Sequence, residues 1–272
     1  MPIVAERRKA FRQLHDGGCF ALPNPWDTGS AKYLEYLGFK AIATTSAGFA
    51  FTRGLADGAV GRDLMLAHVR EMVEATDLPV NADFENGYAD DPDGVAENVR
   101  RCVETGVAGL SIEDNSGRGD KLLYDVELAA ERIRAAKAAI EDSGVMLVGR
   151  AECFLVGQED IGEVIRRLTA YAEAGADCLY APGIREREHI AAVVKAISPK
   201  PVNLLISAPN GLTISDAAAL GVRRVSVGGA LSRAAWGGFI KAAKELADHG
   251  TFGGFVGAAP HGDLQKLFFE KF

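Results

Sequence analysis

Cysteine and histidine are scarce in this chain, and neither occurs in a pattern that predicts a site. The 272 residues include four cysteines, without a Cys-x-x-Cys pair, which argues against a disulfide framework or a structural zinc site. The five histidines lie in segments that read as helices or loops, and none follows a predicted strand. Catalysis by a Ser/His/Asp or Cys/His arrangement therefore has no support in the sequence.

Long apolar runs and long basic runs are also missing. No run approaches the length of a membrane span, and residues 1–14 are charged and lack the apolar core of a signal peptide. The formal net charge is −7, and Arg7-Arg8-Lys9 is only a short basic run. We therefore expect a cytoplasmic protein without membrane or nucleic-acid partners. To bind an anionic substrate, such a chain needs a local positive centre, which a metal ion would supply.

Short apolar runs alternate with helical patterns along the chain. Continuous apolar runs are typical of parallel strands buried on both faces, and stripes such as Met65, Val69, Met72 and Val73 predict the helices that cover them. This alternation predicts a (β/α)8 TIM-type barrel. A doubly wound open sheet is the alternative, but its GxGxxG fingerprint is absent after the first run. The eight runs span residues 19–23, 40–46, 78–84, 109–114, 145–151, 178–182, 201–206 and 224–228.

Four glycines recur between a helical pattern and the following strand. They are Gly38, Gly106, Gly175 and Gly221, each one residue removed from the next strand-like run. A glycine can take the left-handed conformation that ends a helix and turns the chain, so the repeat supports successive β/α units.

We assign residues 1–246 to the barrel and residues 247–272 to a Gly-rich tether followed by an amphipathic helix. Leu264, Leu267, Phe268 and Phe272 share one face of the last segment. A tethered apolar helix of this kind often docks on a neighbouring subunit. The alternative is that it closes the bottom of its own barrel.

Acidic side chains follow two neighbouring strand-like runs. Asp83 and Glu85 end one run, and Glu113 and Asp114 end the next. Because the carboxyl ends of parallel barrel strands gather on one face, these carboxylates can share one hard divalent cation, Mg²⁺ or Mn²⁺. The alternative for each acid alone is a helix cap or a solvated loop position.

Further polar residues fall at other strand ends. Arg150 is suited to bind a substrate carboxylate through its planar fork, and the alternative is a structural ion pair with Glu152, Asp83 or Glu113. The segment Thr45-Ser46-Ala47-Gly48 could offer backbone N–H groups to a carboxylate, or it could be a turn of small residues. The other polar residues at these ends are Asn24, Asp27, which we expect to cap a helix, Tyr88 and Asn203.

Five motifs together resemble the isocitrate lyase/phosphoenolpyruvate mutase superfamily. They occur in the expected order and near the expected strands, and the resemblance covers residues 18–230. The combination and order are more specific than any single motif. The motifs are Thr44-Thr45-Ser46-Ala47-Gly48, Gly61-Arg62-Asp63, Asp83-Phe84-Glu85-Asn86-Gly87-Tyr88, Ile112-Glu113-Asp114 and Gly149-Arg150.

The resemblance implies a modified TIM barrel whose C-terminal helix is swapped between subunits of a tetramer, a dimer of dimers. It also implies a 2-oxo acid substrate and Mg²⁺. Position by position, Asp83 matches the direct metal ligand, Glu85 and Glu113 match acids that hold the ion largely through water, and Asp63 matches the acid near the reacting group. Matches to substrate contacts are Ser46, Ala47, Gly48, Asn203 and Arg150.

Two departures from the superfamily pattern narrow the expected reaction. The loop Asn115-Ser116-Gly117-Arg118-Gly119-Asp120-Lys121 lacks the Cys and His of isocitrate lyases, and Ala181-Pro182-Gly183 lacks the His of phosphoenolpyruvate mutases. We therefore expect a Mg²⁺-dependent C–C lyase of a small 2-oxo acid, of the oxaloacetate decarboxylase or acylpyruvate-lyase type, which leaves a metal-stabilised pyruvate enolate. Tyr88, Lys121 or a metal-bound water would protonate it. The alternatives are phosphoenolpyruvate mutase or phosphonopyruvate hydrolase chemistry, and a 2-oxo acid binding protein without turnover.

Overall fold

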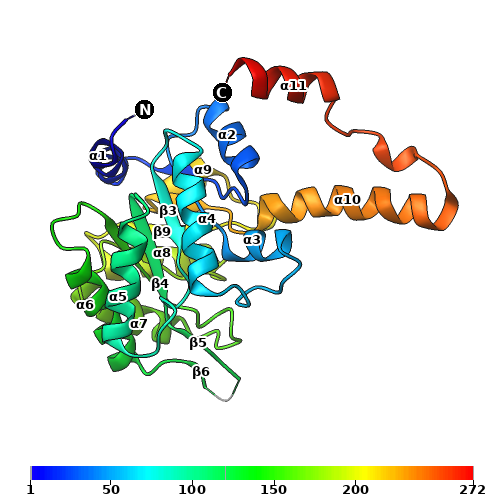
Figure 1. The fold of residues 1–272 in the computed structure, drawn as a ribbon. Coiled ribbons are helices and arrows are strands. Elements are labelled where there is room, and N and C mark those ends of the chain that lie inside the picture. Colours follow the sequence, from blue (N-terminus) through cyan, green and yellow to red (C-terminus); the bar gives the residue numbers. More distant parts are fainter. Residues whose placement is uncertain (1, 120, 272) are drawn as a thin grey trace.

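Eight parallel strands form the central sheet, which the helices enclose (Figure 1). Their spatial order is β1-β10-β9-β8-β7-β4-β3-β2. This computed structural model describes residues 2–119 and 121–271, without the side chain of Lys121. The Ala43 amide donates to the Pro23 carbonyl at 3.0 Å, so β2 meets the end of β1 and the barrel is nearly closed. The strands are β1 (Phe20–Leu22), β2 (Ile42–Ala43), β3 (Val80–Asp83), β4 (Gly109–Glu113), β7 (Met146–Arg150), β8 (Cys178–Tyr180), β9 (Val202–Leu205) and β10 (Arg224–Ser226).

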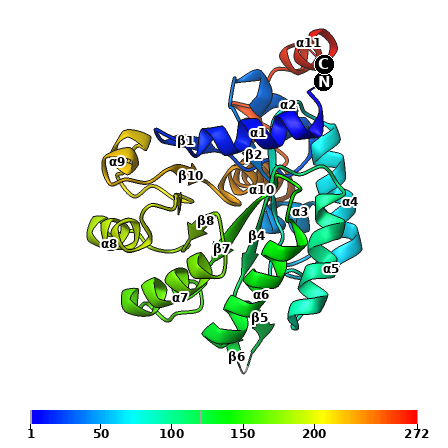
Figure 2. The ribbon, with the colours of Figure 1, turned by 90° about the vertical axis from the view of Figure 1, so that its left-hand side faces the viewer.

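Each strand lies within one of the eight predicted apolar runs, so the predicted (β/α)8 barrel is confirmed. Helices surround the sheet and bury their apolar stripes against it (Figure 2). The four predicted glycines have φ between 83° and 108°, in the left-handed region. The helices are α1 (Val4–Leu14), α2 (Thr28–Tyr36), α3 (Ser46–Thr52), α4 (Arg62–Glu74), α5 (Pro92–Val103), α6 (Val126–Ala139), α7 (Ile161–Glu173), α8 (Arg187–Ile197), α9 (Ile214–Ala219), α10 (Ala230–His249) and α11 (His261–Glu270).

Helix α1 closes the N-terminal end of the barrel. Phe11 is fully buried in a cluster with residues in or next to β1, β2, β4 and β7. The Arg8 guanidinium donates to the carbonyls of Val103, Val107 and Ser143, each at 2.9 Å, and so ties α1 to the loops at that end. The site must therefore open at the opposite end, where the strands have their C-termini.

A short antiparallel hairpin follows β4 and is not a barrel strand pair. It consists of β5 (Asn115–Arg118) and β6 (Lys121–Leu123), in a stretch whose sequence we interpreted as a loop. Near its turn, Arg118 forms an ion pair with Asp90 at 3.2 Å and lies over the ring of Tyr124. The hairpin is thereby held against the loop that follows β3.

Helix α10 leaves the barrel, and α11 returns beside α2 after a short 3-10 turn, Gly253–Phe255 (Figure 1). Leu267 of α11 is buried within the chain, whereas Phe269 is 90% exposed. Phe272, which we placed on the same apolar face, lies outside the described residues. Helix α10 also spans the predicted domain boundary at residue 246 and carries exposed Trp236, Phe239 and Ile240.

Candidate active site at the C-terminal ends of the strands

Two adjoining cavities open at the C-terminal ends of the barrel strands. The outer one has a volume of about 440 Å³, and the inner one, which extends into the barrel, about 130 Å³. Ser46, Asp57 and Arg150 line both cavities, so the two are parts of one site. Asp83 lines only the inner cavity, and the outer cavity is also lined by Glu85, Tyr88, Glu113 and Glu152.

Arg150 lies at the centre of the site between three carboxylates. Its Nη1 is 3.2 Å from Asp83 Oδ1 and 3.1 Å from Glu113 Oε2, and its Nε donates to Glu152 Oε1 at 2.5 Å. These are the three partners that we named for a structural ion pair. Burial alone would lower the pKa of Arg150, but Glu113 and Glu152 raise it well above its usual value. The guanidinium therefore stays charged, and its single positive charge lies among three carboxylates.

Asp83 is fixed by the start of helix α3. The Ser46 amide and hydroxyl each donate to Asp83 Oδ2 at 3.0 Å. The same hydroxyl lies 3.1 Å from Asp57 Oδ1, and the Asp83 amide donates to the Thr44 hydroxyl at 2.8 Å. Asp83 thus has one orientation, set by strands β2 and β3 together.

The loop after β3 has an unusual backbone. Glu85, Gly87 and Tyr88 have φ of 47°, 76° and 56°, in the left-handed region that side chains other than glycine rarely adopt. A side chain at Gly87 would also approach Ile112 and Val95 to 3.2 Å. This conformation buries the Glu85 carboxylate and the Tyr88 hydroxyl at the barrel mouth. Glu85 Oε1 and Tyr88 Oη are both buried without a hydrogen-bond partner among the described residues.

The pKa values of three carboxyl groups in the site are raised. Burial and the charge of Asp83 raise the pKa of Glu85 to about 7. Burial also raises the pKa of Glu113 well above its usual range, although Arg150 opposes this rise. The pKa of Asp57 is raised by burial and by Asp83. An additional positive charge in this cavity would lower all three pKa values and stabilise the ionised site.

The residues present fit a hard divalent cation that keeps part of its water shell. Among the described residues, no three acidic, histidine or cysteine side chains converge into a closed metal cage. Mg²⁺ does not need such a cage, because it is usually held by one or two carboxylates plus water and substrate oxygens. The buried, unpartnered Glu85 Oε1 and the excess of acids over Arg150 match this kind of binding.

A buried network holds Glu152 beside Arg150. Asp114 is 1% exposed, and its Oδ1 accepts the Glu152 amide at 2.8 Å. Its Oδ2 accepts from Arg167 at 3.0 Å and from the Tyr171 hydroxyl at 2.5 Å. Asp114, which we grouped with the metal-binding acids, is therefore fully engaged below the site.

The segment Thr45–Gly48 begins helix α3 rather than forming a turn. The Thr45 hydroxyl accepts the Gly48 amide at 3.2 Å and so caps the helix, while the Ser46 amide is engaged by Asp83. The Ala47 amide lies in the first turn of this helix and makes no hydrogen bond outside it in the described part of the chain. Gly48 must be small, because a side chain there would come within 2.6 Å of Thr45 Cγ2. Asp27 caps α2 as predicted, through the Ser30 amide at 2.7 Å.

One predicted site residue lies apart from this cluster. Asp63 is in the first turn of α4, with a side chain 79% exposed and an ion pair to Arg62 at 2.8 Å, and it lines neither cavity. The backbone of Lys121 is part of β6, but its side chain lies outside the described residues. Asn203 does line the inner cavity, where it is 1% exposed.

Asp57 is the acid that sequence reasoning missed. It lies in the loop between α3 and α4, with no strand or motif beside it to mark it. The only available signal was the position of an acid between the Ser46 motif and the Gly61-Arg62-Asp63 motif.

We expect Asp57→Asn to lower kcat/KM about tenfold or more, because it changes the charge next to Ser46 and Asp83. Asp63→Asn removes the same charge from an exposed position, and its kcat/KM should stay within about twofold of the parent. Steady-state kinetics of the two variants checks this. A larger loss of kcat/KM in Asp63→Asn than in Asp57→Asn would show that Asp63 takes part in the reaction.

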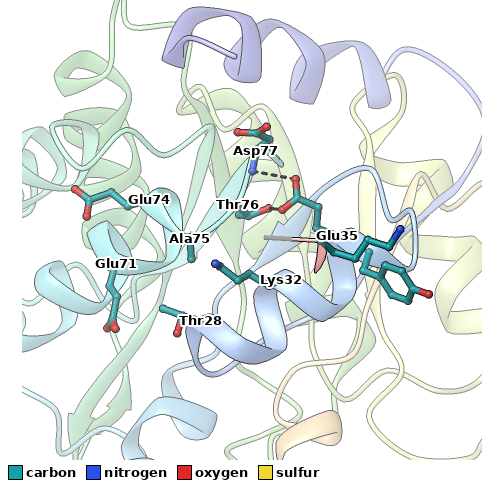
Figure 3. A pocket seen from close by; sticks show the side chains of 10 residues that line it. Thr28, Lys32, Glu35, Glu71, Glu74, Ala75, Thr76 and Asp77 are labelled. Carbon is teal, nitrogen blue, oxygen red and sulfur yellow. Dashed lines mark hydrogen bonds between the residues drawn. The ribbon is translucent and has the colours of Figure 1, made fainter. Parts of the chain in front are cut away.

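A further cavity, of about 750 Å³, lies on the outer surface between α2 and α4 (Figure 3). Its lining is mainly charged, and Glu35 within it accepts hydrogen bonds from the Thr76 hydroxyl at 2.9 Å and the Asp77 amide at 3.1 Å. Thr76 and Asp77 precede β3, so this cavity lies toward the N-terminal ends of the strands. None of the predicted site residues whose side chains the structure describes lines it.

With this fold and site in view, comparison with known proteins gives the class of the chain. The sequence profile of the phosphoenolpyruvate phosphomutase family matches residues 11–247, so the chain belongs to this family, within the phosphoenolpyruvate mutase/isocitrate lyase superfamily. The resemblance predicted from the motifs is therefore confirmed. None of the helices in the described ranges combines the length and apolar character that a bilayer crossing needs.

Individual relatives differ in the reaction that their names state. Oxaloacetate decarboxylase from Pseudomonas putida (strain GB-1) is 32% identical over 235 residues, which cover 80% of this chain and 77% of the relative. A candidate lyase/mutase from Burkholderia cenocepacia J2315 is 47% identical, with a TM-score of 0.95 and 98% of both chains covered. Phosphonopyruvate hydrolase, solved with oxalate and Mg²⁺, is 25% identical, with a TM-score of 0.86 over 97% of this chain and 95% of the other.

Proposed function

We propose that this protein is a Mg²⁺-dependent lyase that cleaves a carbon–carbon bond of a small 2-oxo acid, as an oxaloacetate decarboxylase or an acylpyruvate lyase does. The observation that carries the proposal is the cluster at the barrel mouth, where Asp83, Glu113 and Glu152 surround one arginine and a Glu85 oxygen is buried without a partner. The relatives named oxaloacetate decarboxylase support the same class of reaction.

Asp83, Glu85 and Glu113 would hold the cation, directly or through water, with Mn²⁺ as a possible substitute. When bound there, Mg²⁺ would neutralise the negative charge that develops on the oxygen atoms of a 2-oxo acid. Within the chain, Ser46 holds Asp83 in place for this role, and the positive charge of Arg150 reduces the repulsion between the acids.

The substrate carboxylate would lie against Arg150 and the Ala47 amide, on the side of the cavity formed by the start of α3. Both groups donate hydrogen bonds to anions, and both line the inner cavity. Cleavage of the bond beyond C3 leaves the bonding electron pair on C3, delocalised onto the neighbouring 2-oxo group, and C3 must then receive a proton. Tyr88 is a candidate donor, because it lines the outer cavity beside Glu85 and a tyrosine hydroxyl is protonated at neutral pH. Burial and Glu85 raise its pKa further, so it would give its proton only to a strongly basic carbon. Lys121 stays a second candidate.

A panel of 2-oxo acids, screened with Mg²⁺ for release of pyruvate, tests the proposal. We expect turnover of oxaloacetate or of an acylpyruvate, and competitive inhibition by oxalate, which resembles the pyruvate enolate. Faster turnover of phosphonopyruvate or methylisocitrate would overturn the proposal. Tight oxalate binding that ignores a metal chelator, without turnover of any acid in the panel, would instead indicate a binding protein.

The hairpin residues argue against phosphonate chemistry as the main activity. A phosphonate needs several cations around its oxygens, but Arg118 is engaged by Asp90 at 3.2 Å. After β8 the chain continues as Ala181, Pro182 and Gly183, which add no positive charge.

We also propose that the protein is a homo-oligomer, a tetramer built as a dimer of dimers, in which the C-terminal helices contact a neighbouring subunit. Exposed Trp236, Phe239 and Ile240 on α10 and Phe269 on α11 support this. Ending the chain after Gly262 removes α11, so we expect a smaller species or aggregation. Light scattering checks the mass, and an unchanged mass in a folded truncated protein would contradict the proposal.

A further inference from the structure

A second arginine lies inside the barrel and has no counterpart among the motifs discussed above. Arg224, at the start of β10, is 3% exposed and lines the inner cavity together with Arg150. Its Nε donates to Asn203 Oδ1 at 2.8 Å, and its Nη1 makes a long contact of 3.4 Å with Asn81 Oδ1. A guanidinium carries five N–H donors, so most of its donors have no partner among the described residues.

The register of the strands explains how the two arginines come to share one cavity. Arg150 of β7 pairs with Tyr180 of β8, Tyr180 pairs with Asn203 of β9, and Asn203 pairs with Arg224 of β10. All four side chains line the inner cavity. They form one row across the barrel wall, with an arginine at each end and Asn203 held by the Ser226 hydroxyl at 2.9 Å.

The two arginines differ in their electrostatic surroundings. Arg150 contacts three carboxylates, whereas the hydrogen-bond partners of Arg224 among the described residues are two neutral amides. No carboxylate in the described part of the chain forms an ion pair with Arg224. The buried His15 near it has a pKa lowered to about 3 by its burial and by Arg224, so it is neutral and adds no charge. A buried cation without a counter-ion favours an anionic ligand strongly.

We infer that Arg224, with Asn203 beside it, binds the distal carboxylate of a four-carbon dicarboxylic 2-oxo acid, and so selects diacids over acids with an apolar end. The inference deepens the proposed function and rests on it, since both use the same cavity. The inner cavity, at about 130 Å³, has the volume of about four liquid water molecules, which suits a carboxylate but not a long acyl chain.

Calorimetric binding of two stable four-carbon acids tests the inference without requiring turnover. The (S) forms of malate and 2-hydroxybutanoate differ only in a distal carboxylate against a methyl group. In the presence of Mg²⁺, we expect the parent protein to bind malate at least about tenfold more tightly. Arg224→Gln should weaken malate binding about tenfold and leave 2-hydroxybutanoate within about twofold.

Arg223→Gln is the matched control, because it removes the same charge from the preceding residue, whose guanidinium donates to the Gly18 carbonyl at 2.6 Å outside the cavity. The Arg223→Gln variant should keep the parent's preference for malate over 2-hydroxybutanoate. If Arg224→Gln fails to fold, Arg224→Lys decides, and its preference for malate should fall severalfold because the planar fork is lost. Equal affinity of the parent for both acids, or equal loss of both in an Arg224 variant, would overturn the inference. Absence of any lyase activity would refute the proposed reaction and leave this preference measurable.

Discussion

Asp83→Ala should abolish the response of the protein to Mg²⁺. We expect the parent to melt at a higher temperature with millimolar Mg²⁺ than with a chelator, because a ligand that binds only the folded state stabilises it. In Asp83→Ala this difference should vanish, and turnover of the preferred 2-oxo acid should fall by about 10³-fold or more, since the charge stabilisation is worth several kcal/mol. Thermal melts with and without Mg²⁺, together with steady-state kinetics, measure both effects.

Asp93→Ala is a suitable control for this experiment. Asp93 is an exposed acid in the first turn of α5, away from both cavities, so its removal changes the net charge equally. Its melting temperature should still rise with Mg²⁺. If neither the chelator nor Mg²⁺ changes the melting temperature or the activity of the parent, the acids at the barrel mouth do not bind a metal.

The second large effect is a pH dependence that Glu85 imposes on the metal-free protein. Its pKa is about 7 in the folded chain against an ordinary value of 4.5, so the folded state binds more protons than the unfolded state between these values. Stability should therefore fall as pH rises from about 5 to 8, by at most about 3 kcal/mol from this group. Glu85→Gln cannot ionise, so it should escape this loss and be the more stable protein at pH 8 but not at pH 5.

Urea unfolding in chelator at a series of pH values measures the difference between Glu85→Gln and the parent. Glu97→Gln, at an exposed position of α5, should parallel the parent at every pH. Addition of Mg²⁺ at pH 8 should make the parent more stable than Glu85→Gln, because the cation binds the ionised carboxylate that only the parent has. A pH-independent difference between Glu85→Gln and the parent would show that Glu85 titrates normally.

The barrel could be predicted from the sequence because its signals are local and repeated. Most strands lie in continuous apolar runs, and several helices bury a regular stripe, such as Val95, Val99 and Cys102 of α5. The glycines at the helix ends mark the turns, and their positive φ angles follow from local geometry alone.

The site was only partly predictable, because its contacts join segments that are distant in the sequence. The acids at strand ends were visible, since the ends of parallel strands meet on one face. The bond between Ser46 and Asp57 and the partners of Asp114 depend on how loops and helices pack above the sheet. The hairpin 115–123 carries Gly117 and Gly119 and no apolar alternation, so its pattern was that of a loop.

The hairpin also allows the reaction of this barrel to change without a change in its fold. Strands β4 and β7, on either side of it in the sequence, pair directly through five registered residues, from Gly109 with Met146 to Glu113 with Arg150. The hairpin adds no strand to the barrel, so its length and composition can vary while the wall of the barrel stays intact. Substitutions in this one surface hairpin can therefore change the reaction, while the acids at the strand ends and the fold of the barrel stay the same.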